Sequence, residues 1–394
     1  MRLTGVVLPG LADAHSHAFH RALRGRTHLG SDSFWSWRST MYDVADRLDP
    51  DSLLALATAA FAESALAGFS VVGEFHYLHH AAAGRRYDDP NAMGEALREA
   101  AHRAGVRLTL LDACYLTGGI GEPLQGVQER FGDRSVDAWA ARVAALKPDA
   151  TTRLGTAIHS VRAVPADDLG AVAAAFLDYP LHVHVSEQPA ENDQCSAAYG
   201  CSPTQLLAGS GALSPRTTVV HATHVSGHDI GLLAATQTGA CLCPTTERDL
   251  ADGVGPAGML HRAGIPLSLG TDQRAVVDGF EEMRGIEMHE RLTTGKRGHF
   301  SGSQLIDAAT VNGHAALGWP EAGRIAPGCL ADLVAVRRDT VRTAGVDPDQ
   351  VAYAATAADV DTVIVGGEII VENGQHRLGD VPRLLANAVS AVVR

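Results

Sequence analysis

The sequence predicts an α/β protein built on a (β/α)8 TIM barrel, with a small β appendage made from the two ends of the chain. Three observations lead to this prediction. Short apolar, β-branched runs alternate with longer stretches rich in Ala and Leu, a pattern typical of strands alternating with helices. Eight such runs occur within about 315 residues, the length of one barrel. Polar residues suited to chemistry fall where these runs end, and a barrel places its active site at that end of its strands.

The expected elements follow one another in a regular order. The eight expected strands lie at 6–14, 69–76, 106–114, 153–159, 181–186, 218–222, 240–243 and 266–270. The expected helices lie near 51–67, 92–104, 136–146, 166–177, 203–210, 227–237 and 257–263, and two more follow the eighth strand at 280–293 and 301–317. Asp49-Pro50 marks a helix start, and Gly68, Gly105 and Gly264 mark helix ends.

The pattern changes after about residue 318. Short β runs at 323–330, 331–336 and 363–371 are separated by turn residues, without long helices between them. We therefore expect a barrel over residues 9–320. Residues 1–8 and 321–394 are expected to form the small β appendage, a reduced β-sandwich that ends in a helix.

The composition excludes several classes of function. The chain has 394 residues, with 32 Lys and Arg against 45 Asp and Glu, and its net charge of −13 argues against binding nucleic acid or an anionic membrane. The six scattered cysteines do not resemble a secreted disulfide framework. Neither a signal peptide nor an apolar run of about 18 residues is found. We expect a cytoplasmic protein whose partner is a small molecule.

Histidines at strand ends predict a metal site. His15 and His17 close the first strand, and because side chains alternate along a strand, both imidazoles point to the same side. His184 ends the fifth strand, and Asp272 follows the eighth. Three imidazoles and one carboxylate, with a position left for water, suit Zn²⁺ or a similar divalent ion such as Fe²⁺. A His-x-His pair alone would be equally consistent with two polar residues at a strand end that bind no metal.

We expect one metal ion per subunit. A carboxylated lysine can bridge two metals in such barrels, but the chain has only Lys147 and Lys296, and neither ends a strand. His182 shares a strand face with His184 but lies deeper, so His184 is the preferred ligand. Cys241 and Cys243 are interpreted as small core residues, not ligands.

Two more polar residues belong to the same predicted rim. Glu187 follows His184 by three residues, and His221 ends the sixth strand. Together with the four proposed ligands they complete a constellation drawn from the ends of several different strands. This constellation resembles the amidohydrolase superfamily in its mononuclear deaminase branch.

Several longer segments narrow the resemblance to the N-formimino-L-glutamate deiminases. These are His15-Ser-His-Ala-Phe-His20, Asp32-Ser-Phe-Trp-Ser-Trp-Arg38, Glu74-Phe-His-Tyr-Leu-His-His80, His159-Ser-Val-Arg162, His184-Val-Ser-Glu-Gln188, Val220-His-Ala-Thr-His224 and Cys243-Pro-Thr-Thr-Glu247. The likeness spans about residues 8–335. It implies a barrel of the metal-dependent hydrolase type, found as a homodimer in this family.

The resemblance implies a reaction and the residues that carry it. The reaction is hydrolysis of N-formimino-L-glutamate to N-formyl-L-glutamate and ammonia, in histidine degradation. Asp272 and His221 would move the proton of the attacking water, and Glu187 would hydrogen-bond the formimino nitrogen. The substrate carries two carboxylates. Arg38 and Arg162 match the positions that grip them, beside the hydroxyl group of Tyr77.

The sequence also departs from the family pattern. His20 stands where relatives commonly have Gln near the substrate carboxylates, although a protonated imidazole would still donate a hydrogen bond there. Relatives have several tens of residues before His-x-His, so the appendage is reduced here or the start is truncated. The loop at 271–279 is less standard after its aspartate.

Three functions therefore stay open on the sequence alone. Besides the formimino substrate, the same scaffold would suit a deaminase of another amidine, a guanidine or an aminopurine. A pocket for an aminopurine ring needs stacking aromatic side chains. The third alternative is a metal-binding protein without catalysis, although every expected ligand position is filled.

Overall fold

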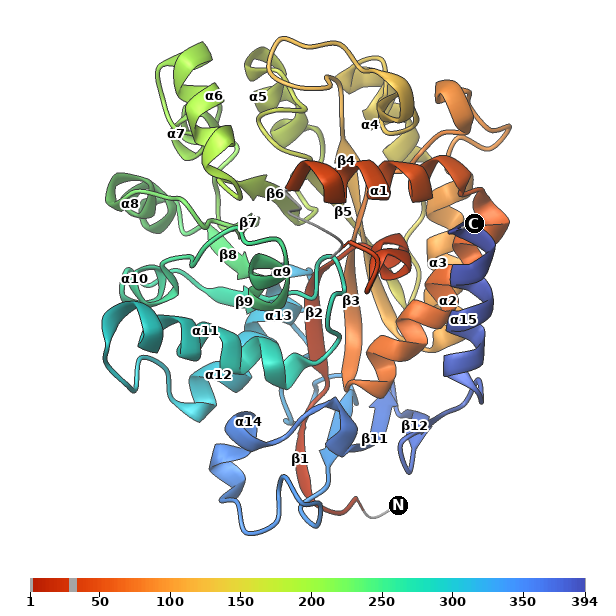
Figure 1. The fold of residues 1–394 in the computed structure, drawn as a ribbon, viewed down its shortest axis with the longest axis vertical. Helices are drawn as coiled ribbons and strands as arrows, with labels where there is room; N and C mark the ends of the chain where they lie inside the picture. The colour runs from red at the N-terminus through yellow and green to blue at the C-terminus, as the bar shows by residue number, and fades with distance from the viewer. Residues whose placement is uncertain (1–2, 28–33, 394) are drawn as a thin grey trace.

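A computed structural model describes residues 3–27 and 34–393 and contains two separate sheets (Figure 1). The larger sheet has eight parallel strands in the order β2-β3-β4-β5-β6-β7-β8-β9. A bridge between Ser16 and Asp272 joins the end of the first strand to the segment after the last, so the sheet curls into a nearly closed barrel. The predicted (β/α)8 fold is confirmed.

The barrel strands are short and almost entirely buried, as expected for parallel strands covered on both faces. They are β2 (Leu11–Ser16), β3 (Phe69–His76), β4 (Arg107–Cys114), β5 (Thr152–Ile158), β6 (Leu181–Val185), β7 (Thr217–His221), β8 (Gly239–Leu242) and β9 (Leu267–Leu269). Their C-terminal ends meet at one mouth, which the helix α1 crosses (Figure 1).

Most helices lie where the sequence predicts them. The outer layer consists of α2 (Pro50–Leu66), α3 (Ala92–Ala104), α4 (Val136–Ala145), α5 (Ala166–Ala175), α7 (Pro203–Gly209), α8 (Gly227–Ala235), α10 (Ala257–Arg262), α11 (Gly279–Thr294), α12 (Gly302–Ala309) and α13 (Val311–Ala316). A single helix over 301–317 is wrong, because non-helical backbone at Thr310 separates α12 from α13.

Three helices near the mouth are absent from the sequence prediction. They are α1 (Phe34–Arg47), α6 (Pro189–Tyr199) and α9 (Pro244–Asp249). Short 3₁₀ segments also occur, of which η1 (Ala18–Leu23) and η3 (Gly126–Arg130) lie near the mouth. These additions are functionally important because they carry side chains of the candidate site.

The smaller sheet is antiparallel and has the order β1-β10-β11-β12-β13. Its strands are β1 (Val6–Pro9), β10 (Leu333–Val336), β11 (Val360–Val365), β12 (Glu368–Glu372) and β13 (Gln375–His376), so both ends of the chain contribute. Residues 323–330 form turns, where a strand was expected, and 363–371 contains two strands joined at Gly366-Gly367. Both of these glycines have positive φ values, which suit a tight turn.

The first predicted strand, 6–14, is two strands that belong to different sheets. Residues before Gly10 pair with β10, and residues after it pair with β3. A Cβ atom at Gly10 would lie 2.3 Å from Oγ of Ser70, so only glycine fits where the chain passes between the sheets. Apolar residues run through the break without interruption, which is why the sequence shows one strand.

The small sheet is tied to the barrel by a buried ion pair and by the C-terminal helix. Nε of Arg107 in β4 donates to Oδ2 of Asp332 at 2.8 Å, and both side chains are almost fully buried. The helix α15 (Val381–Val392) packs beside α2 (Figure 1). Together these contacts connect the far end of the chain to the outer layer of the barrel.

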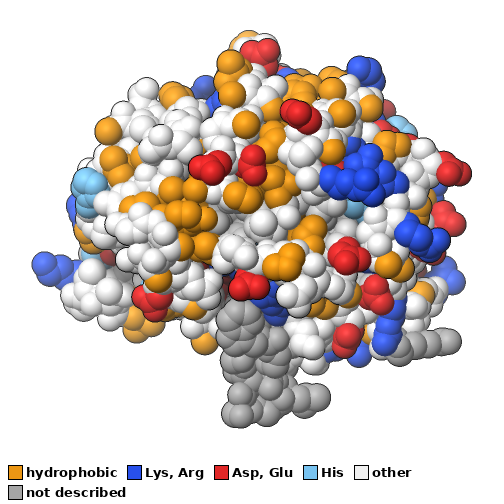
Figure 2. Space-filling model, turned by 90° about the horizontal axis from the view of Figure 1, so that it is seen from above, with side chains coloured by type: hydrophobic (Ala, Val, Ile, Leu, Met, Phe, Trp, Pro, Cys, Tyr) orange, Lys and Arg blue, Asp and Glu red, His pale blue; other side chains and the backbone are white. Residues whose placement is uncertain are grey.

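The surface seen from the top of Figure 1 mixes side chains of all types. Figure 2 shows Lys and Arg on this face in separate groups, with acidic and apolar side chains between them. Within residues 3–27 and 34–393, no helix is long and apolar enough to cross a membrane.

Candidate active site and metal centre

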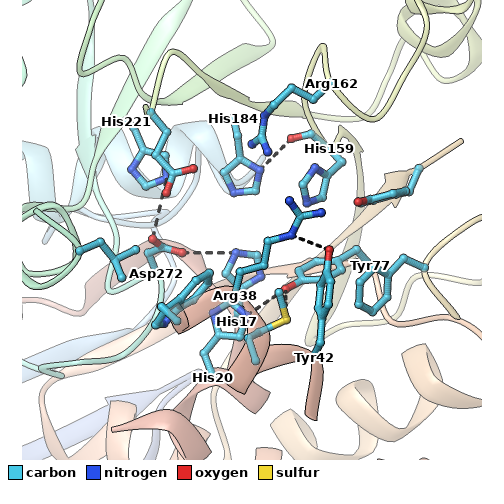
Figure 3. A pocket seen from close by; sticks show the side chains of 16 residues that line it. His17, His20, Arg38, Tyr42, Tyr77, His159, Arg162, His184, His221 and Asp272 are labelled. Carbon is cyan, nitrogen blue, oxygen red and sulfur yellow. Dashed lines mark hydrogen bonds and ion pairs between the residues drawn. The ribbon is translucent and has the colours of Figure 1, made fainter. Parts of the chain in front are cut away.

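Four side chains that are far apart in the sequence meet at the mouth of the barrel. His15 lies in β2 and His17 follows it; His184 lies in β6 and Asp272 follows β9. The Nε2 atoms of His15 and His17 lie 3.4 Å and 3.3 Å from Oδ1 of Asp272. The Nε2 atoms of His15 and His184 are 3.1 Å apart. Figure 3 shows His17, His184 and Asp272 turned toward one space, so the structure brings the four proposed ligands together.

Hydrogen bonds behind the rings fix which ring nitrogens face this space. Nδ1 of His17 donates to the carbonyl of Phe75 at 2.9 Å, and Nδ1 of His184 donates to the carbonyl of His159 at 2.8 Å. A ring nitrogen that donates to a carbonyl carries the proton, so Nε2 of each of these rings presents a lone pair. This arrangement behind an imidazole is typical of metal ligands.

The donor set fits a divalent metal ion. Bonds of about 2.05 Å to a tetrahedral ion place neighbouring donor atoms about 3.3 Å apart, close to the separations between the atoms described above. Two lone pairs and a carboxylate oxygen converge without a positive group between them, an arrangement that a cation stabilises. His221 also lies within reach of His15 and His184, so a fifth donor is available.

Burial and hydrogen bonding set the protonation of these groups. Burial lowers the pKa of His15 to about 3, although Asp272 acts to raise it. Burial also holds the pKa of His184 well below its ordinary value. Burial acts to raise the pKa of Asp272, but the polar contacts with His15 and His17 and the charge of His221 outweigh it and hold that pKa well below its usual range. Neutral imidazoles and an ionised carboxylate are the forms that bind a divalent ion.

A group of carboxylates surrounds His221, the last residue of β7. Its Nε2 atom lies 3.9 Å from Oε1 of Glu187 and 3.8 Å from Oδ2 of Asp272. Its Nδ1 atom lies 3.6 Å from Oε1 of Glu247, on α9. Burial acts to lower the pKa of His221, but these carboxylates outweigh it and hold the pKa well above its ordinary value. His221 therefore has a high proton affinity beside the proposed metal ligands, where it can hold a proton and hand it on.

Backbone strain is concentrated at this end of the strands. Ser186, His221, Ala222 and Asp272 have φ values of 52°, 69°, 50° and 41°. Residues other than glycine rarely adopt this left-handed backbone conformation. Backbone strain of this kind persists where the surrounding structure holds a functional geometry.

Two arginine side chains, Arg38 and Arg162, also line this pocket, and both lie near His159 (Figure 3). Nε of Arg38, on α1, donates to the hydroxyl of Tyr42 at 2.7 Å. Nε of Arg162, after β5, donates to Oε2 of Glu191 at 2.8 Å. The two terminal nitrogens of Arg162 form no hydrogen bond within residues 3–27 and 34–393, so its guanidinium fork can receive a carboxylate.

Tyr77 and His20 form a buried pair beneath these arginines. The Tyr77 hydroxyl lies 2.9 Å from Nε2 of His20. Burial holds the pKa of Tyr77 well above and that of His20 well below their ordinary values, so both groups are neutral. Nδ1 of His20 is buried and has no hydrogen-bond partner in the described part of the chain. A neutral imidazole replaces the protonated one considered from the sequence.

Several pocket residues were missed by the sequence analysis. These are Trp37, Met41, Tyr42, Tyr115, Phe131, His159 and Leu250. His159 follows β5 directly, and the strand-end position that identified His184 would also have identified it. The aromatic residues lie in α1 and in loops, where no local pattern marks them. Asp32 and Ser33, the start of one motif, lie outside the described residues.

His182 lies apart from the metal ligands. Its Nε2 atom donates to the carbonyl of Ala316 at 2.9 Å, on α13. The structure thus places His184, and not its neighbour on the same strand face, beside His15.

The chain is similar to known proteins over most of its length. The family model described as "Amidohydrolase family" matches residues 6–370. The formimidoylglutamate deiminase of Pseudomonas aeruginosa is 36% identical, over 95% of this chain and 86% of that protein. The 8-oxoguanine deaminase of the same organism is 30% identical, over 98% of this chain and 88% of that protein.

Solved structures give a consistent result. An amidohydrolase from Brucella melitensis superposes with a TM-score of 0.91 at 33% identity, over 98% of this chain and 90% of that one. An adenosine deaminase from Xanthomonas campestris with bound zinc superposes with a TM-score of 0.83 at 25% identity, over 98% of this chain and 84% of that one.

Proposed function

The chain belongs to the amidohydrolase family and is a hydrolase of its deaminase type, and from this premise we propose that it converts N-formimino-L-glutamate and water to N-formyl-L-glutamate and ammonia. One observation carries the proposal. The pocket is lined by carboxylates and imidazoles and also by the guanidinium groups of Arg38 and Arg162. A substrate with a cationic amidine at one end and two carboxylates at the other matches this distribution of charge.

The proposed metal ligands are His15, His17, His184 and Asp272. The ion is proposed to be Zn²⁺, in line with the zinc-containing adenosine deaminase, and Fe²⁺ is the alternative. When bound, it supplies Lewis-acid chemistry and makes a water molecule acidic enough to lose a proton near neutral pH.

The chain's own residues then manage the protons. Asp272 and His221 take the proton of the water that attacks the formimino carbon, since Oδ2 of Asp272 and Nε2 of His221 are neighbours. Glu187, whose Oε1 atom also lies 3.9 Å from Nε2 of His221, hydrogen-bonds the amidine nitrogen. His221 returns the proton to the departing nitrogen, the C–N bond breaks, and ammonia leaves.

The carboxylates of the substrate are proposed to bind at the two arginine side chains of the pocket. Arg38 and Arg162 are proposed to hold the carboxylates through paired hydrogen bonds, and Tyr77 with His20 completes their surroundings. Because α1 lies across the mouth, Arg38 is proposed to approach the substrate from above, while Arg162, which follows β5, approaches it from the rim of the barrel.

The test is a substrate panel with the purified, metal-loaded protein. N-formimino-L-glutamate is expected to release ammonia and N-formyl-L-glutamate, both followed by NMR. Formamidine, which has the amidine but lacks both carboxylates, is the matched control and is expected to react poorly. Ammonia release from an aminopurine, with none from N-formimino-L-glutamate, would overturn the proposal.

A second candidate function is favoured by one observation. Trp37, Tyr42, Tyr115 and Phe131 give the pocket the aromatic walls that stack against a purine ring. The similarity to 8-oxoguanine deaminase points the same way. Guanidinium groups form strong, charge-assisted hydrogen bonds with carboxylates, so the two arginines favour the dicarboxylate over an uncharged ring.

The assembly, the cellular location and the partners of the protein are proposals as well. We propose a homodimer that works in the cytoplasm on this small dicarboxylate, without nucleic-acid or membrane partners. Light scattering of the purified protein measures the assembly, and a monomeric mass would contradict it.

A further inference from the structure

His221 and Cys243 form a second group of metal-ligating side chains together with Asp272, which is also one of the four proposed ligands. One donor atom from each lies within 4.8 Å of the others. We propose that this group holds a second divalent ion of the thiophilic kind, Zn²⁺ or Co²⁺, and that this ion inhibits the enzyme. The metal site does not rest on the identity of the substrate; only the inhibition rests on the proposed function.

The carboxylate of Asp272 can serve both positions. Its Oδ1 atom faces the Nε2 atoms of His15 and His17, at 3.4 Å and 3.3 Å. Its Oδ2 atom faces Nε2 of His221 at 3.8 Å. The two oxygens therefore point toward different sets of donors, and one carboxylate can bridge two ions.

Cys243 completes the second position. It follows β8 at the same mouth of the barrel, its backbone N–H donates to Oε1 of Glu247 at 2.9 Å, and its side chain is fully buried. Thiolate sulfur prefers zinc and similar ions over Mg²⁺ or Ca²⁺. The sulfur–metal bond forms as the thiol proton leaves to solvent, with no change in oxidation state.

The surroundings favour a second positive ion. His221 is almost fully buried, and its Nδ1 atom has no hydrogen-bond partner in the described part of the chain. Carboxylates of Glu187 and Glu247 lie 3.9 Å and 3.6 Å from its ring nitrogens. These negative charges offset the charge of a second ion beside the first.

Another candidate group, outside the barrel wall, is not suited to a metal. His76, His79 and Asp112 also place donor atoms within 4.8 Å of one another. However, Asp112 already accepts hydrogen bonds from Nη1 and Nη2 of Arg142 at 2.6 Å and 2.8 Å, and from Trp139 at 3.1 Å. A guanidinium group in that position repels a cation.

Occupation of the second position removes the proton acceptor. A His221 ring nitrogen that binds an ion has no lone pair left for the proton of the attacking water. General acid–base catalysis contributes roughly 10²–10⁴-fold, so we expect activity to fall by about 10²-fold when the second ion is bound.

The direct test is a Co²⁺ titration of the metal-free protein without substrate. The first equivalent is expected to bind nitrogen and oxygen only, and the second is expected to add a sulfur-to-cobalt charge-transfer band in the near ultraviolet. The metal content is expected to rise from one to two ions per subunit. No sulfur band, or saturation at one ion, would overturn the proposal whatever the substrate is.

Serine variants assign the sulfur. The Cys243→Ser variant is expected to lack the band and to bind only one ion per subunit. Cys114→Ser is the matched control, because Cys114 is also fully buried and ends a barrel strand, β4, that is not adjacent to β8, and it is expected to keep the band. A band that survives in Cys243→Ser would contradict the assignment, and Cys243→Ala repeats the test if the serine variant does not fold.

Inhibition is measured separately with the reactive substrate from the panel. Excess Zn²⁺ is expected to inhibit the wild-type protein and the Cys114→Ser protein, and a weak chelator is expected to reverse it. The activity of Cys243→Ser is expected not to fall with rising Zn²⁺. If two ions bind and the protein keeps full activity, the second metal site stands, but its inhibitory role is overturned.

Discussion

At the scale of single residues, the candidate site depends on the direction in which each imidazole points. Carbonyl acceptors behind His17 and His184 hold Nδ1, so Nε2 of each ring faces Asp272 or His15. Strand-end positions in the sequence were sufficient to predict that these side chains lie together, and their role as metal ligands stays a prediction. The carbonyl groups that fix the rings belong to Phe75 in β3 and to His159 directly after β5, and no local pattern reveals these hydrogen bonds.

The substitution Asp272→Asn tests the central carboxylate. An amide keeps the shape but removes the charge that His15 and His17 stabilise, so we expect ammonia release to fall by about 10³-fold and metal content to drop. Steady-state kinetics and metal analysis measure the two effects. Full activity with a full complement of metal would show that Asp272 is neither ligand nor proton acceptor.

The substitution Arg162→Ala tests carboxylate binding. Loss of a charge-assisted hydrogen bond of about 2 kcal/mol is expected to raise KM about thirtyfold, with a smaller change in kcat. Because Glu191 is buried and pairs with Arg162, the single variant also leaves an unpaired carboxylate. The double variant Arg162→Ala/Glu191→Gln removes that charge, and a KM restored to the wild-type value in it would argue against a substrate contact.

At the scale of elements, the site depends on how closely β2 and β9 approach each other. A Cβ atom on Gly270 would lie 2.7 Å from the carbonyl oxygen of His15 and 2.8 Å from its Cβ atom. Gly270→Ala must therefore displace His15, and we expect metal affinity to fall by at least about tenfold. Competition with a chelator measures the affinity. Gly209→Ala, where a Cβ atom meets nothing within 4 Å, is the control, and equal affinities of the two variants would contradict the prediction.

The helix α13 introduces a pH-dependent contribution to stability. Burial lowers the pKa of His314, whose Nδ1 donates to the carbonyl of Thr310 at 2.9 Å, below its ordinary value. The folded protein therefore favours the neutral ring, while the unfolded chain takes up a proton as pH falls through about 6.5. Stability is complete above that pH and decreases below it.

His314→Gln is expected to remove this contribution. Between pH 7 and pH 5.5, the free energy of unfolding should fall less steeply in the variant, by up to about 1.4 kcal/mol per pH unit for one proton. Urea unfolding at several pH values measures both slopes. Parallel curves for the two proteins would rule out His314 as the titrating group.

The elements that the sequence analysis missed are those that close the site. The predicted helices have an apolar face or lie between clear strands, whereas α6 lacks an apolar face of helical period and α9 has six residues. Yet α6 carries Glu191, α9 carries Glu247 and α1 carries Arg38. Helices at a barrel mouth are selected for the groups they present, so burial patterns do not identify them.

At the scale of the whole molecule, the barrel could be predicted because its strands repeat a simple pattern with regular spacing. The division of residues 6–14 between two sheets could not, since apolar residues on both sides of Gly10 are equally suited to either sheet. The pairing of β1 with β10 joins residues at opposite ends of the chain. Such a contact depends on the complete fold and leaves no local trace.

The buried pair of Arg107 and Asp332 is expected to stabilise the connection between the two sheets. Asp332→Asn leaves the guanidinium group buried without its counter-charge, and we expect a loss of about 3 kcal/mol or more in the free energy of unfolding. Asp339→Asn makes the same change in an exposed pair with Arg337 and is expected to change the free energy of unfolding far less, because water screens that pair. Similar urea midpoints for the two variants would show that the buried pair is not a major tie.

The passage of the chain through Gly10 also limits how the protein can be shortened. A stop codon after the last barrel helix would remove β10 and leave Val6–Pro9 as an unpaired, apolar edge immediately before the segment that carries His15. Exposed edges of this kind associate with one another, so the truncated product is expected to aggregate. The smallest fragment suitable for expression therefore retains both termini, and a barrel core cannot be excised from this polypeptide.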